Sequence, residues 1–180
     1  MSFPYSVGQV PVYYNHFNTG RPKGKDIDDY VSKYLDIPNE PLLPFGFGLS
    51  YTTFVYDELE LSAPEITHEK PLTISVKVTN TGTLTGTVTN TGTLTGTEVV
   101  QLYIRDLVAD VVRPVKELKD YQKINLKPSE TKAVVFRLTA EQLRYYHSDL
   151  TYTSDVGKFQ VFVGTNSTNV LESTFKFTEA

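Results

Sequence analysis

The sequence predicts an all-β fold over residues 51–180, an immunoglobulin- or fibronectin III-like antiparallel β-sandwich, with an irregular N-terminal extension at residues 1–50. Three observations lead to this fold class. Seven or eight short segments alternate apolar and polar residues or are rich in β-branched and aromatic residues, as strands are. Turn-forming residues separate these segments, and no helical pattern of useful length is present. The chain has no Cys and no Trp, which excludes an antibody-like domain and favours the fibronectin III variant.

The N-terminal extension contains one strand candidate, Gln9–Asn15, in which Pro11 marks a strand start or an edge. The residues that follow are rich in Pro, Gly, Asn and Asp, and Asp26–Leu35 could form one or two helical turns at most. A lone strand and a long loop cannot bury their own apolar residues, so this part is not expected to be an independent domain. An unpaired strand at Val10–Tyr14 would invite pairing with a second chain, which predicts a homodimer through that strand.

The sandwich begins with three predicted strands. Phe54–Leu61 changes the phase of its alternation between Tyr56 and Leu59, which predicts a β-bulge. Leu72–Val78 and Glu98–Asp106 alternate with period two, as expected of strands with one face in a core. With a short connection, the last two strands would form a β-hairpin or a neighbouring pair.

The connection between these two strands is unusual. Val78–Thr87 is repeated without a change as Val88–Thr97, so the loop at residues 78–97 carries a ten-residue tandem duplication. Because ten is even, a slip of pairing by one copy keeps every side chain on its original face. Three outcomes are open: a protruding hairpin, a loose surface loop, or a choice of register between the copies. Each doubling of loop length costs only about 0.6 kcal/mol of closure entropy, so the fold is expected to tolerate the insertion.

The second half of the chain continues the strand pattern. Five further strands are predicted, at Lys116–Leu126, Lys132–Leu138, His147–Thr153, Lys158–Val163 and Ser173–Thr178. Lys127–Glu130 has the composition of a turn. Thr139–Gln142 has the spacing of a capping box, which predicts one short helical turn near Leu143.

Charge and composition limit the partners of the chain. The net charge of −4 and the pI near 5.4 give no basic surface for nucleic acid or an anionic membrane, so neither partner is expected. No segment approaches the roughly 20 apolar residues that span a bilayer, and the N-terminus lacks the features of a signal peptide. Without Cys there are no disulfides and no thiolate chemistry. The compartment stays open: cytoplasm, periplasm and secretion are all compatible.

The histidines do not suggest a metal site. His16, His68 and His147 are scattered along the chain and lack a His-x-x-x-His or Cys partner. Solvated or hydrogen-bonded histidines are the preferred interpretation. No metal ligand and no cofactor-binding residue is therefore predicted.

Three other short motifs also have structural explanations. Asp26, Asp28 and Asp29 lack the Gly and the terminal Glu of a calcium loop, so a solvated acidic helix start is preferred. Gly46–Gly48 is only a fragment of a glycine-rich phosphate loop, and two glycines beside an aromatic residue more often mark a tight backbone passage. Asn166–Thr168 is an Asn-x-Ser/Thr sequence, which matters only in a eukaryotic secretory setting.

Several longer motifs together are specific enough to indicate a family. They are Ser6–His16, Asn18–Pro22, Pro44–Phe54, Asn90–Gly92 with Gly96–Asp106, Arg113–Leu118 and Leu126–Glu130. With these motifs the chain closely resembles the C-terminal end of glycoside hydrolase family 3 β-glucosidases and β-xylosidases. The resemblance covers essentially the whole chain. The second copy of the ten-residue repeat departs from the family pattern and puts only the loop geometry in doubt.

The resemblance implies a domain assignment and a role. Residues 1–50 would be the remnant of the end of an α/β sandwich domain plus a linker, and residues 51–180 a fibronectin III-like domain. The nucleophilic Asp and the acid/base Glu of the family lie in motifs upstream of this chain, so no residue here is assigned a catalytic role. Substrate-binding residues, sugar and linkage specificity and oligomeric state are left open.

The resemblance therefore predicts a non-catalytic structural domain of a β-glucosidase. The parent enzyme would hydrolyse terminal β-glycosidic bonds in oligosaccharides with retention, and the missing catalytic domains would be the partners that this chain braces. On its own the chain is expected to be inactive. The alternative is a carbohydrate- or surface-binding β-sandwich module, which rests on the Tyr and Phe content and on the frequent use of this fold in recognition.

Overall fold

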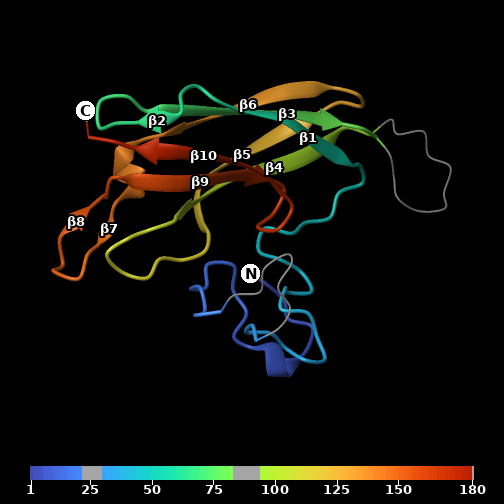
Figure 1. Cartoon of the computed structure of the whole chain (residues 1–180). Coiled ribbons are helices and arrows are strands. Elements are labelled where there is room, and N and C mark those ends of the chain that lie inside the picture. The colour runs from blue at the N-terminus through green and yellow to red at the C-terminus, as the bar shows by residue number, and fades with distance from the viewer. Residues whose placement is uncertain (22–29, 83–93, 180) are drawn as a thin grey trace.

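The computed structural model describes residues 1–21, 30–82 and 94–179. Within these ranges the chain forms ten β-strands and two short 3-10 helices (Figure 1). In chain order the elements are η1 (Val7–Gln9), β1 (Phe54–Leu61), β2 (Glu65–Ile66), β3 (Leu72–Asn80), β4 (Gly96–Asp106), β5 (Glu117–Leu126), β6 (Thr131–Leu138), η2 (Ala140–Leu143), β7 (Tyr145–Tyr146), β8 (Tyr152–Thr153), β9 (Gly157–Gly164) and β10 (Val170–Phe177).

The strands form a β-sandwich, as the sequence predicts. One sheet has the order β1-β3-β6 and the other β2-β10-β9-β4-β5. Neighbouring strands are antiparallel except for the short β2, which pairs with β10 in parallel. The strands β7 and β8 form a small separate hairpin beside the sandwich (Figure 1).

The core lies between the two sheets and follows from the alternation of the strands. In the first sheet, the buried side chains of Val76 and Val134 sit opposite each other on β3 and β6. In the second sheet, Leu102 and Val163 do the same on β4 and β9. All four belong to one apolar cluster. Because every second residue of these strands is apolar, each sheet presents one dry face to the other.

The predicted pairing of Leu72–Val78 with Glu98–Asp106 is wrong. The strand β3 pairs with β1 and β6, whereas β4 pairs with β5 and β9, so the two strands belong to different sheets. Each contributes its apolar face to the same core from an opposite side, and alternation alone cannot distinguish this arrangement from a hairpin. The chain therefore crosses from one sheet to the other between Asn80 and Gly96.

The tandem duplication is only partly described. Residues 83–93 lie outside the described residues, and so do the three outcomes considered for the loop. The described part of copy one is Val78–Gly82, which contains the last three residues of β3. The described part of copy two starts at Leu94 and contains the first two residues of β4. The described residues thus include the first half of copy one and the end of copy two.

Two local predictions on the sandwich are confirmed. The register of β1 against β3 shifts between Asp57 and Glu60, where the sequence predicts a bulge, and Glu58 has a φ of 50°. The helix η2 follows Thr139, which forms a capping box with Gln142: the backbone N–H of Thr139 donates to the Gln142 side chain at 2.9 Å.

The strand predicted at His147–Thr153 is wrong for most of its length. A turn separates β7 from β8, and the carboxylate of Asp149 accepts hydrogen bonds from the backbone N–H (2.9 Å) and hydroxyl (2.7 Å) of Thr151. Leu150 at the same turn has a φ of 68°. The local hydrogen bonds of an Asp side chain compete with an extended backbone, and here the turn prevails.

The strand predicted at Gln9–Asn15 is also wrong. Residues up to Gln9 form η1, and no strand follows over residues 10–15. In the described parts of the chain no strand lies alongside this segment to pair with it, and an isolated strand is not stable in water. The strand that suggested a homodimer is therefore absent from the described structure, although dimerisation itself stays untested.

The buried side chain of Gln9 instead organises the extension. Its Oε1 accepts from the backbone N–H of Tyr5 (2.8 Å), and its Nε2 donates to the carbonyl oxygens of Pro38 (2.9 Å) and Glu40 (3.0 Å). The helical turns predicted within Asp26–Leu35 are absent from residues 30–35, and residues 26–29 lie outside the described range.

Candidate functional site

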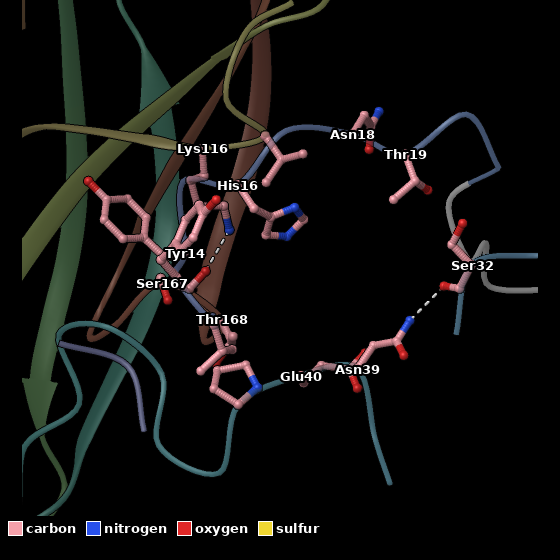
Figure 2. Close-up of a pocket in the computed structure, with 14 residues that line it drawn as sticks. Tyr14, His16, Asn18, Thr19, Ser32, Asn39, Glu40, Lys116, Ser167 and Thr168 are labelled. Atoms are coloured by element: carbon pink, nitrogen blue, oxygen red, sulfur yellow. Dashed lines mark hydrogen bonds between the residues drawn. The ribbon is translucent and has the colours of Figure 1, made fainter. Parts of the chain in front are cut away.

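A cavity of about 370 Å³ lies where the extension meets the sandwich, and Figure 2 shows it in close-up. Its walls come from the extension on one side, and from the β4–β5 and β9–β10 connections on the other. The lining residues are Val12, Tyr13, Tyr14, His16, Asn18, Thr19, Ser32, Asn39, Glu40, Pro41, Val115, Lys116, Ser167 and Thr168.

Tyr14 holds the extension against the sandwich at this cavity through an aromatic contact and a hydrogen bond. The Tyr14 ring stacks on Phe45 with 4.3 Å between centroids, and its edge contacts the buried Tyr103 of β4 at 5.7 Å. The backbone N–H of Leu118 donates to the Tyr14 hydroxyl at 3.3 Å. The carbonyl of His16 accepts from the N–H of Val115 at 2.9 Å. Tyr14 and His16 are thereby held at the wall of the cavity.

Lys116 supplies a cation to the same wall. Its Nζ donates to the carbonyl oxygen of Ser167 at 2.7 Å and lies 4.2 Å from the Phe162 centroid and 5.9 Å from that of Tyr103. Burial lowers the pKa of the Lys116 amine to about 8, because the charged form loses hydration. Among the described ion pairs Lys116 has no carboxylate partner, so two aromatic faces and one carbonyl are its principal contacts.

The turn between β9 and β10 places Ser167 next to Lys116. The backbone N–H of Ser167 donates to the carbonyl of Phe45 at 2.9 Å, which ties this turn to the extension. The side-chain oxygen of the buried Asn166 accepts from the hydroxyl of Thr168 (2.9 Å) and from the N–H of Asn169 (2.8 Å). The Asn-x-Ser/Thr sequence is therefore part of a turn, and glycosylation would require Asn166 to leave it.

The glycines of Gly46–Gly48 do not form a phosphate loop. Gly46 has a φ of 81°, and a Cβ at this position would lie 2.1 Å from Oε1 of Gln101. The side chain of Gln101 donates to the carbonyls of Thr165 (2.6 Å) and Gly46 (3.3 Å). Gly46 is thus the tight backbone passage that the sequence predicts, whereas a Cβ on Gly48 would meet no atom within 4 Å.

The far wall of the cavity is built from polar side chains of the extension. The amide of Asn39 donates to the carbonyl of Ser32 at 2.9 Å and accepts from the N–H of Tyr34 at the same distance. Glu40 lies beside Asn39, across the cavity from Lys116 (Figure 2). The cavity thus combines the amine of Lys116, the carboxylate of Glu40, several amide and hydroxyl groups and aromatic rings, which suits binding a polar ligand.

The three histidines lie in separate environments. His16 lines the cavity, His68 contacts Phe177 edge-to-face, and His147 stacks on Tyr145. Among the residues that the structure describes, no group of three or more His, Cys, Asp or Glu side chains could hold a metal ion. The three aspartates considered for calcium, Asp26, Asp28 and Asp29, lie outside those residues.

A second titratable cluster lies where the β4–β5 connection meets the β7–β8 hairpin. The Tyr145 hydroxyl donates to Asp155 and accepts from the backbone N–H of Asp110 at 3.0 Å. The ring nitrogens of His147 lie 3.8 Å from Asp110 and 3.7 Å from Asp155. Burial raises the pKa of the nearby Asp106 to about 6. These contacts attach the hairpin to the connection.

Reasoning from sequence did not single out Lys116. It lies within Arg113–Leu118, a segment that carries the family resemblance, but a single Lys at the start of a predicted strand has no signature of a site. Its surroundings come from Ser167 and Tyr14, which lie 51 and 102 positions away in the sequence. The prediction that the chain has no catalytic residue stays a prediction.

Comparison with known proteins relates the chain to β-glucosidases and β-xylosidases that contain a fibronectin type III-like domain. The family model for the fibronectin type III-like domain matches residues 98–167, which agrees with the observed sandwich. The chain is 44% identical over 177 residues to the periplasmic β-glucosidase of Salmonella typhimurium, covering 98% of this chain and 22% of that protein. A putative β-xylosidase of Formosa agariphila is 35% identical, with 98% and 21% covered.

Solved structures agree with this class. The β-glucosidase of Listeria innocua in complex with isofagomine superimposes with a TM-score of 0.86 and 40% identity, covering 100% of this chain and 24% of that one. The chain belongs to the glycoside hydrolase family 3 β-glucosidases and β-xylosidases and includes their fibronectin type III-like domain. It spans about a fifth of the length of the curated relatives it matches.

The described residues contain no helix that is both long and apolar enough to cross a membrane.

Proposed function

We propose that this chain braces the catalytic domains of a β-glycosidase without taking part in the chemistry. The enzyme would hydrolyse terminal β-glycosidic bonds in oligosaccharides with retention. Residues 1–50 would complete an α/β sandwich domain and lead into the fibronectin III-like domain at residues 51–180. The catalytic domains would be the partners, and the brace would keep their relative orientation, on which an active site shared between them depends.

The exposed apolar surface of the extension carries this proposal. Leu35 and Leu49 are 95% and 93% exposed, and Met1, Val7 and Tyr30 are each more than 85% exposed. Apolar side chains at this density are unfavourable in water unless another surface covers them. The likeness to the Listeria innocua β-glucosidase extends over 100% of the chain, so the path of the extension has a counterpart within a larger enzyme.

The experiment compares three preparations on an aryl β-glucoside: the chain alone, the remainder of the enzyme alone, and the two combined. We expect no turnover from the chain. The remainder should show little activity or lose it quickly on warming, and adding the chain should restore activity in a saturable way. Turnover by the chain that persists after repurification would overturn the assignment as a non-catalytic portion. Unchanged activity of the remainder would overturn the brace.

A second candidate function, carbohydrate binding, is favoured by one observation. Tyr146 and Tyr152 on the β7–β8 hairpin are 66% and 51% exposed and lie 4.8 Å apart, centroid to centroid. Exposed aromatic faces of this kind can stack on sugar rings. Titration of soluble glucans against the wild-type chain and a Tyr146→Ala variant tests this function. Saturable binding by the wild-type chain that Tyr146→Ala loses would support a carbohydrate-binding function. The absence of binding by the wild-type chain would contradict this function.

A further inference from the structure

Lys116 is a partly buried cation whose charge is not neutralised by a neighbouring carboxylate. The carboxylate of Glu117 pairs with Arg113 and Lys119, and Lys116 is in none of the ion pairs of the described residues. Glu172 acts on its charge only at longer range, and Arg105 opposes that effect. A buried charge without a counter-ion is unfavourable, so it is retained mostly where something else binds it.

The amine of Lys116 has donors to spare. An ammonium carries three N–H groups, and one of them is used by the carbonyl of Ser167 at 2.7 Å. The aromatic contacts to Phe162 and Tyr103 hold the side chain in place from behind. The Lys116 side chain lines the cavity, which at about 370 Å³ is large enough for a small ligand.

The rest of the cavity sets the shape and polarity of what could bind. Asn18, Thr19, Ser32 and Asn39 place amide and hydroxyl groups along the wall away from Lys116 (Figure 2). Glu40 lies on this far side and is absent from the charges that act on Lys116. A ligand with its anionic end at Lys116 and hydroxyl groups toward the far wall would therefore avoid repulsion by Glu40.

We propose that this cavity is a carboxylate-binding site in which Lys116 is the counter-ion of the bound group. The carboxylate could come from either of two sources with the same chemistry: a free sugar acid, or an Asp or Glu side chain of the remainder of the protein. A carboxylate completes the hydrogen bonds of the amine and neutralises its charge in a partly dry setting. The first test of this site does not depend on the proposed bracing function.

The test measures the pKa of Lys116 by NMR on the chain labelled at the lysine side chains, with the signal assigned by its loss in Lys116→Met. Glucuronate is the probe and glucose is its neutral match. We expect glucuronate to raise the pKa of Lys116 by at least one unit in a saturable way, which is a tenfold change in proton affinity. Glucose should leave it unchanged.

Variants separate a specific site from general attraction. Lys116→Arg keeps the charge and should retain glucuronate binding, whereas Lys116→Met should lose it. Lys158→Met, which removes an exposed amine of β9, should bind as the wild type does. Equal binding of glucose and glucuronate, or equal binding by Lys116→Met and the wild type, would overturn the proposal.

A second arm distinguishes the sources. The same pKa is measured in the complete protein without added sugar acid. A pKa raised above 10 there, with no further effect of glucuronate, would assign the carboxylate to a side chain of the protein itself. A pKa that stays near 8 and responds to glucuronate would assign it to a free ligand. If neither the chain nor the complete protein shows a rise under any condition, the carboxylate site is wrong, whatever the outcome of the activity assay.

Discussion

Gly46 shows how one residue joins the extension to the sandwich. Its φ of 81° lies in the left-handed region, and its backbone packs directly on the side chain of Gln101. That side chain accepts from the Tyr103 hydroxyl and donates to the carbonyl of Thr165 at 2.6 Å. A residue of the extension thus rests on a polar network of the buried β4 strand, and only glycine leaves that network undisturbed.

Substitution of Gly46 tests this contact. Gly46→Ala should lower the free energy of unfolding by about 1–3 kcal/mol, from backbone strain and displacement of Gln101. Gly48→Ala is the matched control, since no atom lies within 4 Å of its Cβ position, and it should change stability by less than about 0.5 kcal/mol. Urea unfolding measures both variants. Equal effects would show that the passage at Gly46 is not tight.

Asp106 predicts a pH dependence of stability. Burial raises its pKa from 3.8 to about 6, and its Oδ2 has no hydrogen-bond partner among the described atoms. Between these pKa values the folded state binds more protons than the unfolded state, so this group's contribution to stability falls as pH rises from 4 to 6. Asp106→Asn should therefore flatten that slope and raise the melting temperature at pH 7.

Asp149 provides a control of opposite sign. Hydrogen bonds from the Thr151 side chain and backbone lower the pKa of Asp149, so its stabilising effect is present at neutral pH and is lost on acidification. Asp149→Asn should lower the melting temperature at pH 7. Melting curves at several pH values from 4 to 7 compare both variants with the wild type. If Asp106→Asn lowered the melting temperature at pH 7, as Asp149→Asn is expected to do, the assignment at Asp106 would be contradicted.

At the residue scale, some contacts depend on local backbone shape and others on residues far away in the sequence. The sequence predicted the first kind better than the second. The tight passage at Gly46 was visible as two glycines around an aromatic residue. The cavity at Lys116 was not, because its walls come from segments such as residues 12–19 and 167–168 that meet only in the folded chain. A site assembled from long-range neighbours leaves no local spacing to detect.

At the scale of elements, strand patterns were informative where a strand has partners. The alternation of β3 and β6 predicted their faces correctly, because burial between two sheets imposes period two. In β4 it predicted the core face, but residues 100–104 are all buried, so the opposite face is covered as well. The alternation did not predict that β3 and β4 lie in different sheets. The strand expected at Gln9–Asn15 failed for a related reason: extended backbone needs neighbouring strands, and the described part of the chain supplies none there.

The duplication offers a test at this scale. Asn80 is fully buried, and its side chain accepts from Thr52 (2.5 Å) and donates to the carbonyl of Leu126 (3.0 Å). Gly96 packs on Thr52 and Phe54, with no room for a Cβ. Asn80 comes from copy one and Gly96 from copy two, yet a single copy contains both an Asn and a Gly at those places in the repeat.

Deleting residues 83–92 should therefore leave the fold intact. The deletion restores one copy, Val78 to Gly82 followed by Thr93 to Thr97, and every ten-residue deletion within the repeat yields this same sequence. We expect a change in unfolding free energy below about 1 kcal/mol, because loop length has a weak effect on closure entropy. Urea unfolding and amide NMR spectra measure the outcome, and a larger loss would show that the second copy has a structural role.

The single-copy chain also sharpens the role of Asn80. With only one Asn left in the repeat, Asn80→Ala should destabilise that chain by about 1–3 kcal/mol, since the carbonyl of Leu126 loses its buried donor. Asn125→Ala is the control: its side chain is exposed and accepts one hydrogen bond from Thr97 at 2.6 Å. An equal effect of the two substitutions would contradict a specific role for Asn80.

At the scale of the whole molecule, the chain has two kinds of surface. The sandwich buries a continuous core between its sheets, and the extension exposes large apolar side chains at a higher density along the chain than the sandwich, where Val108 and Leu150 are also exposed. Figure 1 shows the extension gathered on one side of the sandwich, so its side chains belong to one region of the molecule. Under the proposed function two properties should therefore separate: the stability of the chain should depend on the sandwich core, and its association with the catalytic domains should depend on the extension.

Substitutions on the two surfaces test that separation. Leu35→Ser combined with Leu49→Ser should leave the melting temperature of the chain unchanged, because exposed side chains lose no burial, but should weaken binding to the remainder of the enzyme tenfold or more. Leu72→Ala in the core should lower stability by about 2–5 kcal/mol.

Tyr121→Ser, which changes a residue of β5 that is 63% exposed, is the surface control and should affect neither property. Calorimetric melting and titration of each variant against the remainder of the enzyme supply both measurements. If the double leucine variant bound as tightly as the wild type, the exposed face of the extension would not be the docking surface. If it melted at a lower temperature, these side chains would already be packed within the chain itself.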